Sequence, residues 1–154
     1  ELRNRNDRGS TTLVSVPVVA NVGCDDLSVF AAEQRDEFLQ VDEKIVESSG
    51  EIVAVRAMGE SMADAGIKNG DYILVQFTDN VQNGDRVAAI VGDMVTVKRI
   101  ERKDGVTILY PESKDPKYKP IVLRGDFKIA GKVLCVIPNY SAEMQEVVPM
   151  PEWR

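Results

Sequence analysis

The feature that most constrains this chain is a series of short, β-branched apolar segments separated by turn signals. Three of them occupy residues 72–77, 86–91 and 94–100, and Asn-Gly-Asp comes directly before the first and the second. Asn-Gly and Gly-Asp pairs favour tight turns, so the third segment should form a hairpin with the second across Gly92-Asp93. Further segments of this kind lie at 51–58, 106–112, 118–123 and 127–137. This spacing predicts a mostly β, compact antiparallel fold.

The length of 154 residues suits one domain with flanking segments. Residues 1–12 are polar, lack an initiator Met and predict a flexible linker or arm. Residues 13–22 are β-branched and apolar, residues 25–46 are mixed, residues 47–140 should form the folded domain, and residues 141–154 should form a tail. Pro17 favours an edge strand or extended arm for residues 13–22, because proline removes a ladder donor.

Two alternatives stay open around residue 25. Asp25 or Asp26 is placed to cap a short helix over residues 27–34, although the apolar periodicity there is weak.

The charge balance and the lengths of the apolar runs limit the kinds of partner that this chain is expected to bind. With 25 acidic against 19 basic residues, the net charge is -6, and this segment is not expected to hold DNA by itself. No apolar run approaches the roughly 18 residues that a membrane helix needs, and no signal peptide opens the chain. Cys24 and Cys135 form no metal-ligand spacing and fit a reducing cytoplasm, although a disulfide between them stays open.

The chain contains no histidine. A Ser-His-Asp triad, a Cys-His dyad and a histidine-bearing zinc site are therefore excluded, and neither a metal nor a cofactor is predicted. A serine nucleophile in this chain has to take its general base from a lysine or a carboxylate.

Ser61, in the sequence Gly-Glu-Ser-Met, and Lys98 are the candidates for such a pair. Strand alternation places Lys98 on one face with Thr96 and Ile100, and the intervening positions are valines, so both faces should be buried. Burial can lower a lysine pKa by up to about 3–5 units from roughly 10.4, which would make a neutral amine available as a base. The alternatives are a serine that serves only as a turn or cap residue and a lysine that is solvated.

Several linked motifs resemble the LexA-type self-cleaving repressor family, which shares a serine-lysine dyad fold with signal peptidases. The resemblance runs from Val16 to Ile137. Its carriers are "VPVVANVGC", "GESM", "GIKNGDYILV", "VQNGDRVAAIVGDMVTVKRI", "LYPES", "KYKPIVL" and "IAGKVLCVI". The family has Gly-x-Ser-Met before a Gly-Asp turn and a lysine in a Thr-Val-Lys-Arg-like strand, at a spacing that Ser61 and Lys98 match.

The resemblance implies a reaction and a substrate. Ser61 would attack a peptide carbonyl, Lys98 would take its proton, and the backbone N–H groups of Ser61 and Glu60 would stabilise the oxyanion. The substrate would be the chain's own cleavage-loop region, residues 13–46, folded into the site of a peptidase and dimerisation domain at 47–140.

The family cuts after Ala or Cys and usually before Gly, which places the scissile bond between Cys24 and Asp25. Cys24 fits this pattern, whereas Asp25 departs from it by adding a charged side chain. Because Gly23 precedes Cys24, a slipped register is an alternative. A loop and helix cap without cleavage is another.

The function implied is that of the C-terminal self-cleaving and dimerisation domain of a bacterial or phage transcriptional repressor in the SOS response to DNA damage. A helix-turn-helix DNA reader would precede residues 1–12, and RecA filaments on single-stranded DNA would stimulate cleavage. The chain would be a cytoplasmic homodimer, with dimer contacts through residues 127–137. The alternatives are a UmuD-like accessory protein of a translesion polymerase and a dimerisation module with an inactive dyad. A signal peptidase is disfavoured, because those enzymes carry apolar membrane anchors.

Overall fold

The computed structural model describes residues 12–23, 37–47, 50–92 and 94–139. Most of the regular structure in these ranges is β, which confirms the predicted fold class. The strands are β1 (Leu13–Gly23), β2 (Phe38–Asp42), β3 (Ile52–Met58), β4 (Tyr72–Phe77), β5 (Arg86–Val91), β6 (Met94–Lys103), β7 (Val106–Tyr110), β8 (Ile121–Leu123) and β9 (Phe127–Ile137). A four-residue helix, α2 (Glu43–Val46), and a 3₁₀ helix, η1 (Ala63–Ala65), complete the described elements.

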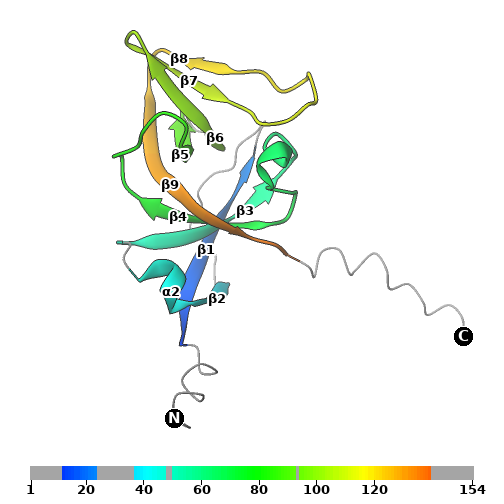
Figure 1. Cartoon of the computed structure of the whole chain (residues 1–154), viewed down its shortest axis with the longest axis vertical. Coiled ribbons are helices and arrows are strands. Elements are labelled where there is room, and N and C mark those ends of the chain that lie inside the picture. The colour runs from blue at the N-terminus through cyan, green and yellow to red at the C-terminus, as the bar shows by residue number, and fades with distance from the viewer. Residues whose placement is uncertain (1–11, 24–36, 48–49, 93, 140–154) are drawn as a thin grey trace, which may run out of the picture.

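The nine described strands form one sheet in the order β2-β1-β3-β4-β9-β5-β6-β7-β8. Neighbouring strands are antiparallel except β1 and β3, which are parallel. The long strand β9 lies in the middle of the sheet (Figure 1), where one half pairs with β4 and the other half with β5. Bulges in both pairings bend the sheet around β9. β9 thereby joins the group β1–β4 to the group β5–β8 (Figure 1).

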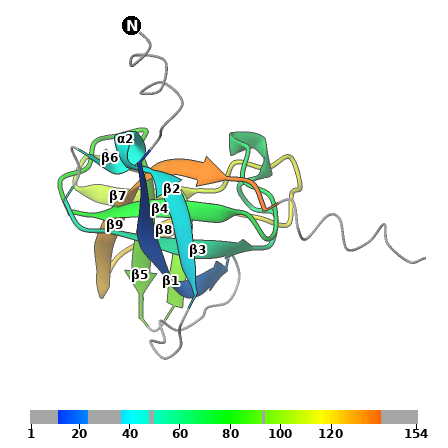
Figure 2. The ribbon, with the colours of Figure 1, turned by 90° about the horizontal axis from the view of Figure 1, so that it is seen from below.

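β1 corrects one prediction, because it is neither an edge strand nor a free arm. Its first half, up to Pro17, pairs with β2, and its second half, from Val18 to Gly23, pairs with β3. Seen from below, β1 and β2 lie side by side across the other strands (Figure 2). Pro17 stands where the pairing passes from one neighbour to the other, so its missing N–H interrupts neither ladder in its middle. The strand then ends with Gly23 opposite Met58, the last residue of β3.

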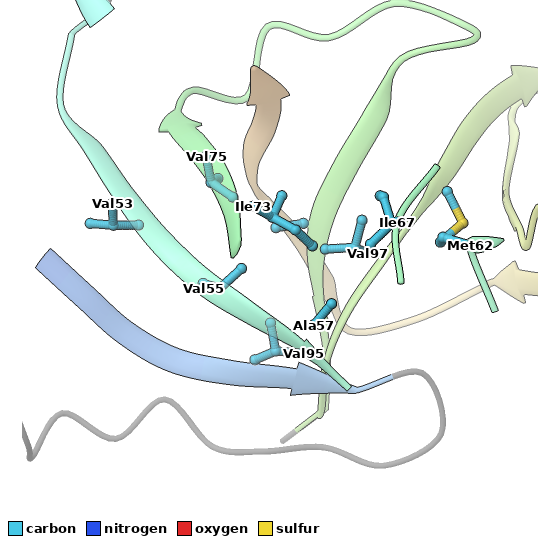
Figure 3. Close-up of a cluster of buried hydrophobic side chains, with 10 residues drawn as sticks. Val53, Val55, Ala57, Met62, Ile67, Ile73, Val75, Val95 and Val97 are labelled. Atoms are coloured by element: carbon cyan, nitrogen blue, oxygen red, sulfur yellow. The ribbon is translucent and has the colours of Figure 1, made fainter. Parts of the chain in front are cut away.

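Three apolar clusters form the core. The first lies between β3, β4 and β6 (Figure 3) and consists of Val53, Val55, Ala57, Met62, Ile67, Ile73, Val75, Ala88, Val95 and Val97. The second consists of Val81, Val87, Ala89, Ile100, Leu109, Leu123 and Ile129. The third packs β1 and β2 against β3 and β4 and consists of Val16, Val41, Ala54 and Leu74. β6 contributes to the first two clusters from its opposite faces, as its alternation predicts.

The predicted strand positions agree closely with the structure from residue 51 onward. β4 and β5 have the predicted bounds, and the hairpin between β5 and β6 is present, with Val91 opposite Met94. β6 runs three residues further than predicted because Glu101, Arg102 and Lys103 pair with β7. β2 and α2 were not predicted, and Asp42 caps α2 by accepting a hydrogen bond from the Lys44 N–H at 2.9 Å. The helix suggested for residues 27–34 lies outside the described residues.

Candidate active site

Ser61 lies in the turn that follows β3 and leads into η1. The turn opens at Gly59, whose φ of 97° suits glycine because a Cβ would be strained there. Met62, next to the serine, packs into the first apolar cluster (Figure 3), and Ser61 itself is only 2% exposed. The Ser61 carbonyl accepts a hydrogen bond from the Glu112 N–H at 2.8 Å, and the Glu112 carbonyl accepts one from the Asp64 N–H at 2.7 Å. The serine is therefore a buried residue in a turn that is tied to the segment after β7.

Lys98 reaches this turn from β6. Its Nζ donates to the Ser61 Oγ at 3.2 Å and to the Thr96 Oγ1 at 2.7 Å. The lysine is 2% exposed, so the alternative of a solvated side chain is wrong. The structure thus brings together the two residues that the sequence singled out.

Thr96 is a site residue to which the sequence reasoning gave no function. It is 3% exposed and lies two positions before Lys98, on the same face of β6. Its hydroxyl oxygen lies closer to the amine than the serine oxygen does. Strand alternation was the signal that could have identified it, since any hydroxyl residue two positions from a buried lysine falls within reach of the amine.

The backbone donors proposed for an oxyanion lie in the same turn. Of the backbone hydrogen bonds between described residues outside the strand ladders, none has the N–H of Glu60 or Ser61 as its donor. The carbonyls of both residues are engaged, by the Ala63 N–H at 3.1 Å and the Glu112 N–H at 2.8 Å. Within the described part of the chain, the turn is therefore fixed through its carbonyl acceptors.

Arg86 holds the side chain of Glu112, whose backbone fixes the serine turn. The guanidinium makes two hydrogen bonds to the carboxylate, from Nε to Oε2 at 2.9 Å and from Nη2 to Oε1 at 3.0 Å. These bonds outweigh the effect of partial burial and hold the pKa of Glu112 below its usual value. Sequence reasoning missed this pair, because residues 86 and 112 are distant in sequence and carry no motif of their own.

The proposed scissile bond, between Cys24 and Asp25, lies outside the described residues. The described chain stops one residue before it, at Gly23 opposite Met58, and Met58 lies three positions before Ser61.

The described chain resumes at Glu37, which is also held against β3. Arg56 Nη2 donates to Glu37 Oε2 at 2.9 Å, and the Tyr72 hydroxyl donates to the same oxygen at 2.9 Å. Both borders of residues 24–36 therefore lie beside β3, the strand that leads to the serine turn.

The described residues also answer three questions that the sequence raised, on the thiol of Cys135, on metal ligands and on membrane-spanning helices. Cys135 is a free thiol, and burial raises its pKa. In the part of the chain that the structure describes, no group of three or more His, Cys, Asp or Glu side chains is arranged to hold a metal ion. None of the described helices combines the length and apolar character needed to cross a membrane.

Comparison with known proteins agrees with the resemblance. Residues 17–134 match the family described as Peptidase S24-like. LexA repressors are similar to the chain at 35% identity, from Leifsonia xyli subsp. xyli over 123 residues (79% of this chain, 52% of the relative) and from Bacillus velezensis over 125 residues (80% and 59%). The LexA repressor of Magnetococcus marinus is 35% identical over 136 residues (87% and 57%). The chain thus spans between half and three-fifths of the length of these relatives, and the predicted resemblance to the LexA-type family is confirmed.

Proposed function

The chain belongs to the Peptidase S24-like family, and from this premise we propose that it is the self-cleaving domain of a LexA-like repressor, with Ser61 as nucleophile and Lys98 as general base. The observation that carries this proposal is the 3.2 Å separation between the Lys98 Nζ and the Ser61 Oγ in a buried site. A nucleophile and a base within hydrogen-bond reach are the arrangement that serine-type catalysis requires.

The reaction proceeds in two stages. The neutral amine of Lys98 takes the proton of the Ser61 hydroxyl as the Oγ attacks the carbonyl carbon of the scissile peptide bond. The resulting ammonium returns the proton to the leaving amine, which departs and leaves an ester on Ser61. Water then hydrolyses the ester, with Lys98 again acting as base. Burial of Lys98 disfavours the ammonium form, and the Thr96 hydroxyl, 2.7 Å from the Nζ, orients the amine toward the serine.

Charge on the tetrahedral intermediate is stabilised by backbone donors. We assign this role to the N–H groups of Ser61 and Glu60, which are not engaged in the described backbone hydrogen bonds of the turn. Donors that are already fixed before reaction need no reorganisation when the charge develops.

The substrate is the chain itself. Ser61 is 2% exposed, which disfavours attack on a separate protein. Gly23 is paired with Met58 in a parallel ladder, where neighbouring strands lie roughly 4.8 Å apart. The proposed scissile bond, between Cys24 and Asp25, follows directly in the sequence, which supports a reaction on the chain's own peptide. Attachment of substrate to enzyme supplies a high effective concentration, which permits even a slow base to act.

In the whole protein, cleavage would separate a DNA-binding domain from a dimerising domain. A dimeric repressor gains operator affinity from two linked half-site contacts, and its affinity collapses when the link is cut. The net charge of -6 suits a domain that does not itself contact DNA. We extend the proposal to homodimer formation, to RecA filaments on single-stranded DNA as the stimulus, and to the SOS response as the setting.

The proposal is tested by intact-mass spectrometry of the chain after incubation at mildly alkaline pH, with and without RecA filaments on single-stranded DNA. We expect two fragments whose masses place the break after Cys24. The matched control is Ser61→Ala, which keeps the turn and removes only the hydroxyl. An uncut chain under both conditions would indicate a dimerisation module with an inactive dyad, and equal cutting of Ser61→Ala would exclude the proposed nucleophile.

A further inference from the structure

The Asn-Gly-Asp sequence occurs twice, and both copies fold in the same way. In the first copy, Asn69–Asp71, the glycine N–H donates to the Ala57 carbonyl at 2.7 Å, and the Ala57 N–H donates to the aspartate carbonyl at 2.8 Å. The aspartate carboxylate accepts from the Lys68 N–H at 2.8 Å. The asparagine Oδ1 accepts from the Gly59 N–H, also at 2.8 Å. The first turn therefore holds the end of β3 at residue 57 and the chain just beyond it at residue 59.

The second copy, Asn83–Asp85, repeats these hydrogen bonds on β6. Its glycine N–H donates to the Ile100 carbonyl at 2.9 Å, and the Ile100 N–H donates to its aspartate carbonyl at 2.9 Å. Its carboxylate accepts from the Gln82 N–H at 2.9 Å. The asparagine Oδ1 accepts from the Arg102 N–H at 2.7 Å. The oxygen of each asparagine thus accepts from an N–H two positions beyond the strand residue that the turn binds, and Asn83 Nδ2 also donates to the Arg102 carbonyl at 3.1 Å.

The two asparagine contacts differ in the backbone segment that each one fixes. Arg102 belongs to β6 and is paired with Thr107 of β7, so the ladder fixes this part of β6 without the asparagine. Gly59 lies beyond the end of β3, at a φ of 97°, two positions before Ser61. Glycine has wide conformational freedom, so the bond to Asn69 selects one conformation among several at the entrance to the serine turn.

We propose that Asn69 is a positioning residue for Ser61 and that the second turn is its purely structural counterpart. The inference rests on the proposed function, because it concerns the rate of the reaction assigned to Ser61 and Lys98. The side chain of Asn69 fixes Gly59, the Glu112 N–H fixes the Ser61 carbonyl, and the two anchors together set the direction of the serine hydroxyl. Loss of the first anchor lets the Oγ move away from the amine, and a displacement of about 1 Å can cost on the order of 100-fold in rate.

The chain supplies its own control for this test, since Asn69→Ala and Asn83→Ala remove the same Oδ1 contact from two copies of one turn, and Asn83→Ala also removes the Nδ2 bond to the Arg102 carbonyl. The first-order rate of self-cleavage is measured across neutral to alkaline pH, with thermal unfolding recorded for each variant. We expect Asn69→Ala to lower the limiting rate at high pH by about tenfold or more, because the Glu112 anchor remains. The pH midpoint should not move. Asn83→Ala should stay within about twofold of the unmutated rate, while both variants lose a few degrees of thermal stability, Asn83→Ala at least as many as Asn69→Ala.

Asn69→Asp provides the rescue, because its carboxylate can accept the same hydrogen bond from the Gly59 N–H. It should recover most of the rate that Asn69→Ala loses. Asn69→Ser, whose hydroxyl is too short to span the turn, replaces Asn69→Ala if the alanine variant does not fold.

Three results would overturn the inference: equal rate losses for the two asparagine variants, an unchanged rate in Asn69→Ala, or no rescue by Asn69→Asp. A chain that gives no Ser61-dependent product would instead overturn the proposed function, and the positioning role with it.

Discussion

The hydroxyl of Ser61 and the amine of Lys98 lie 3.2 Å apart although 37 positions separate them, and each residue is 2% exposed. Burying a hydroxyl and an amine costs free energy even when they bond to each other, and an apolar pair of similar size would be at least as stable in this place. The stability of the fold therefore does not explain why a serine and a lysine are buried together at this place. A strongly buried, mutually bonded serine and lysine point to chemistry, which is the basis of the first two predictions.

Replacing Lys98 with Met removes the amine and keeps most of its volume. We expect Lys98→Met to abolish self-cleavage and to lower the free energy of unfolding by about 1–2 kcal/mol, since the buried hydroxyls of Ser61 and Thr96 lose a hydrogen-bond partner while the cost of burying an amine is relieved. Mass spectrometry and urea denaturation of the same samples check both statements. Residual cleavage at more than about 1% of the unmutated rate would exclude Lys98 as the base.

The pH dependence of cleavage follows from the form of Lys98 that acts. Only the neutral amine accepts a proton, so the rate should rise with pH and level off once the amine is fully deprotonated. Because the loss of a single proton activates the site, the rate should change about tenfold per pH unit on the rising limb. First-order rates measured between about pH 6 and pH 10 test this. A rate that is flat over this range would contradict lysine as the general base.

Much of the fold was predictable because each strand is indicated by the residues of its own segment and the turns beside it. β4 and β5 have the bounds that β-branched segments between Asn-Gly-Asp turns indicate, and the two faces of β6 follow from alternation. Lys98 could be recognised as buried for the same reason. Of the candidate site, only the residues that belong to recognisable motifs could be predicted.

What the sequence did not predict depends on long-range pairing. The parallel pairing of β1 with β3 brings Gly23 to Met58, and no local pattern in either strand specifies it. The contact of Glu112 with the Ser61 carbonyl also joins segments that are distant in sequence. The Asn-Gly-Asp repeat was visible as turn chemistry, but the atoms that each turn holds come from β3 and β6 and were not deducible from the repeat.

The residue after the proposed scissile bond sets a third prediction. Asp25 places a charged side chain where the family usually has glycine, so Asp25→Gly should speed self-cleavage, by about tenfold if the side chain hinders the approach of the peptide to Ser61. The comparison is between first-order rates of the two chains at one pH. Asp26→Gly is the matched control and should leave the rate nearly unchanged. An equal rate for Asp25→Gly and the unmutated chain would mean that the bond lies elsewhere.

The ion pair between Arg86 and Glu112 predicts how stability depends on acid. The pKa of Glu112 is lower in the folded chain than in the unfolded chain, so this group adds stability that is present above its unfolded pKa, about 4.3, and is lost as pH falls through its folded pKa. Arg86→Gln should therefore cost about 0.5–1 kcal/mol at neutral pH, a modest value because Arg86 is partly exposed. Below about pH 4 the cost should shrink toward zero.

Urea denaturation of the two chains at neutral and acidic pH measures this difference. Arg124→Gln is the control, since Arg124 is exposed and forms no ion pair with any residue that the structure describes. A cost of Arg86→Gln that is the same at both pH values would show that the ionised carboxylate of Glu112 is not its source.

The backbone at Gly131 leaves no room for a side chain, which gives a prediction about stability. It lies where β9 passes between β4 and β5, paired with Phe77 on one side and Ala88 on the other. A Cβ at this position would stand 2.5 Å from both the Gln76 carbonyl oxygen and the Val75 Cγ1. The backbone oxygen cannot move without disturbing the ladder, so Gly131→Ala should lower the free energy of unfolding by about 2–3 kcal/mol.

Gly125→Ala is the matched control, because a Cβ there meets nothing within 4 Å and φ is not positive. It should be neutral or slightly stabilising, since alanine restricts the unfolded chain more than glycine does. Denaturant unfolding of the two variants separates crowding from the general effect of removing a glycine. If Gly131→Ala were as stable as Gly125→Ala, β9 would have to sit further from β4 than the ladder allows, and the close approach that joins the two halves of the sheet would be wrong.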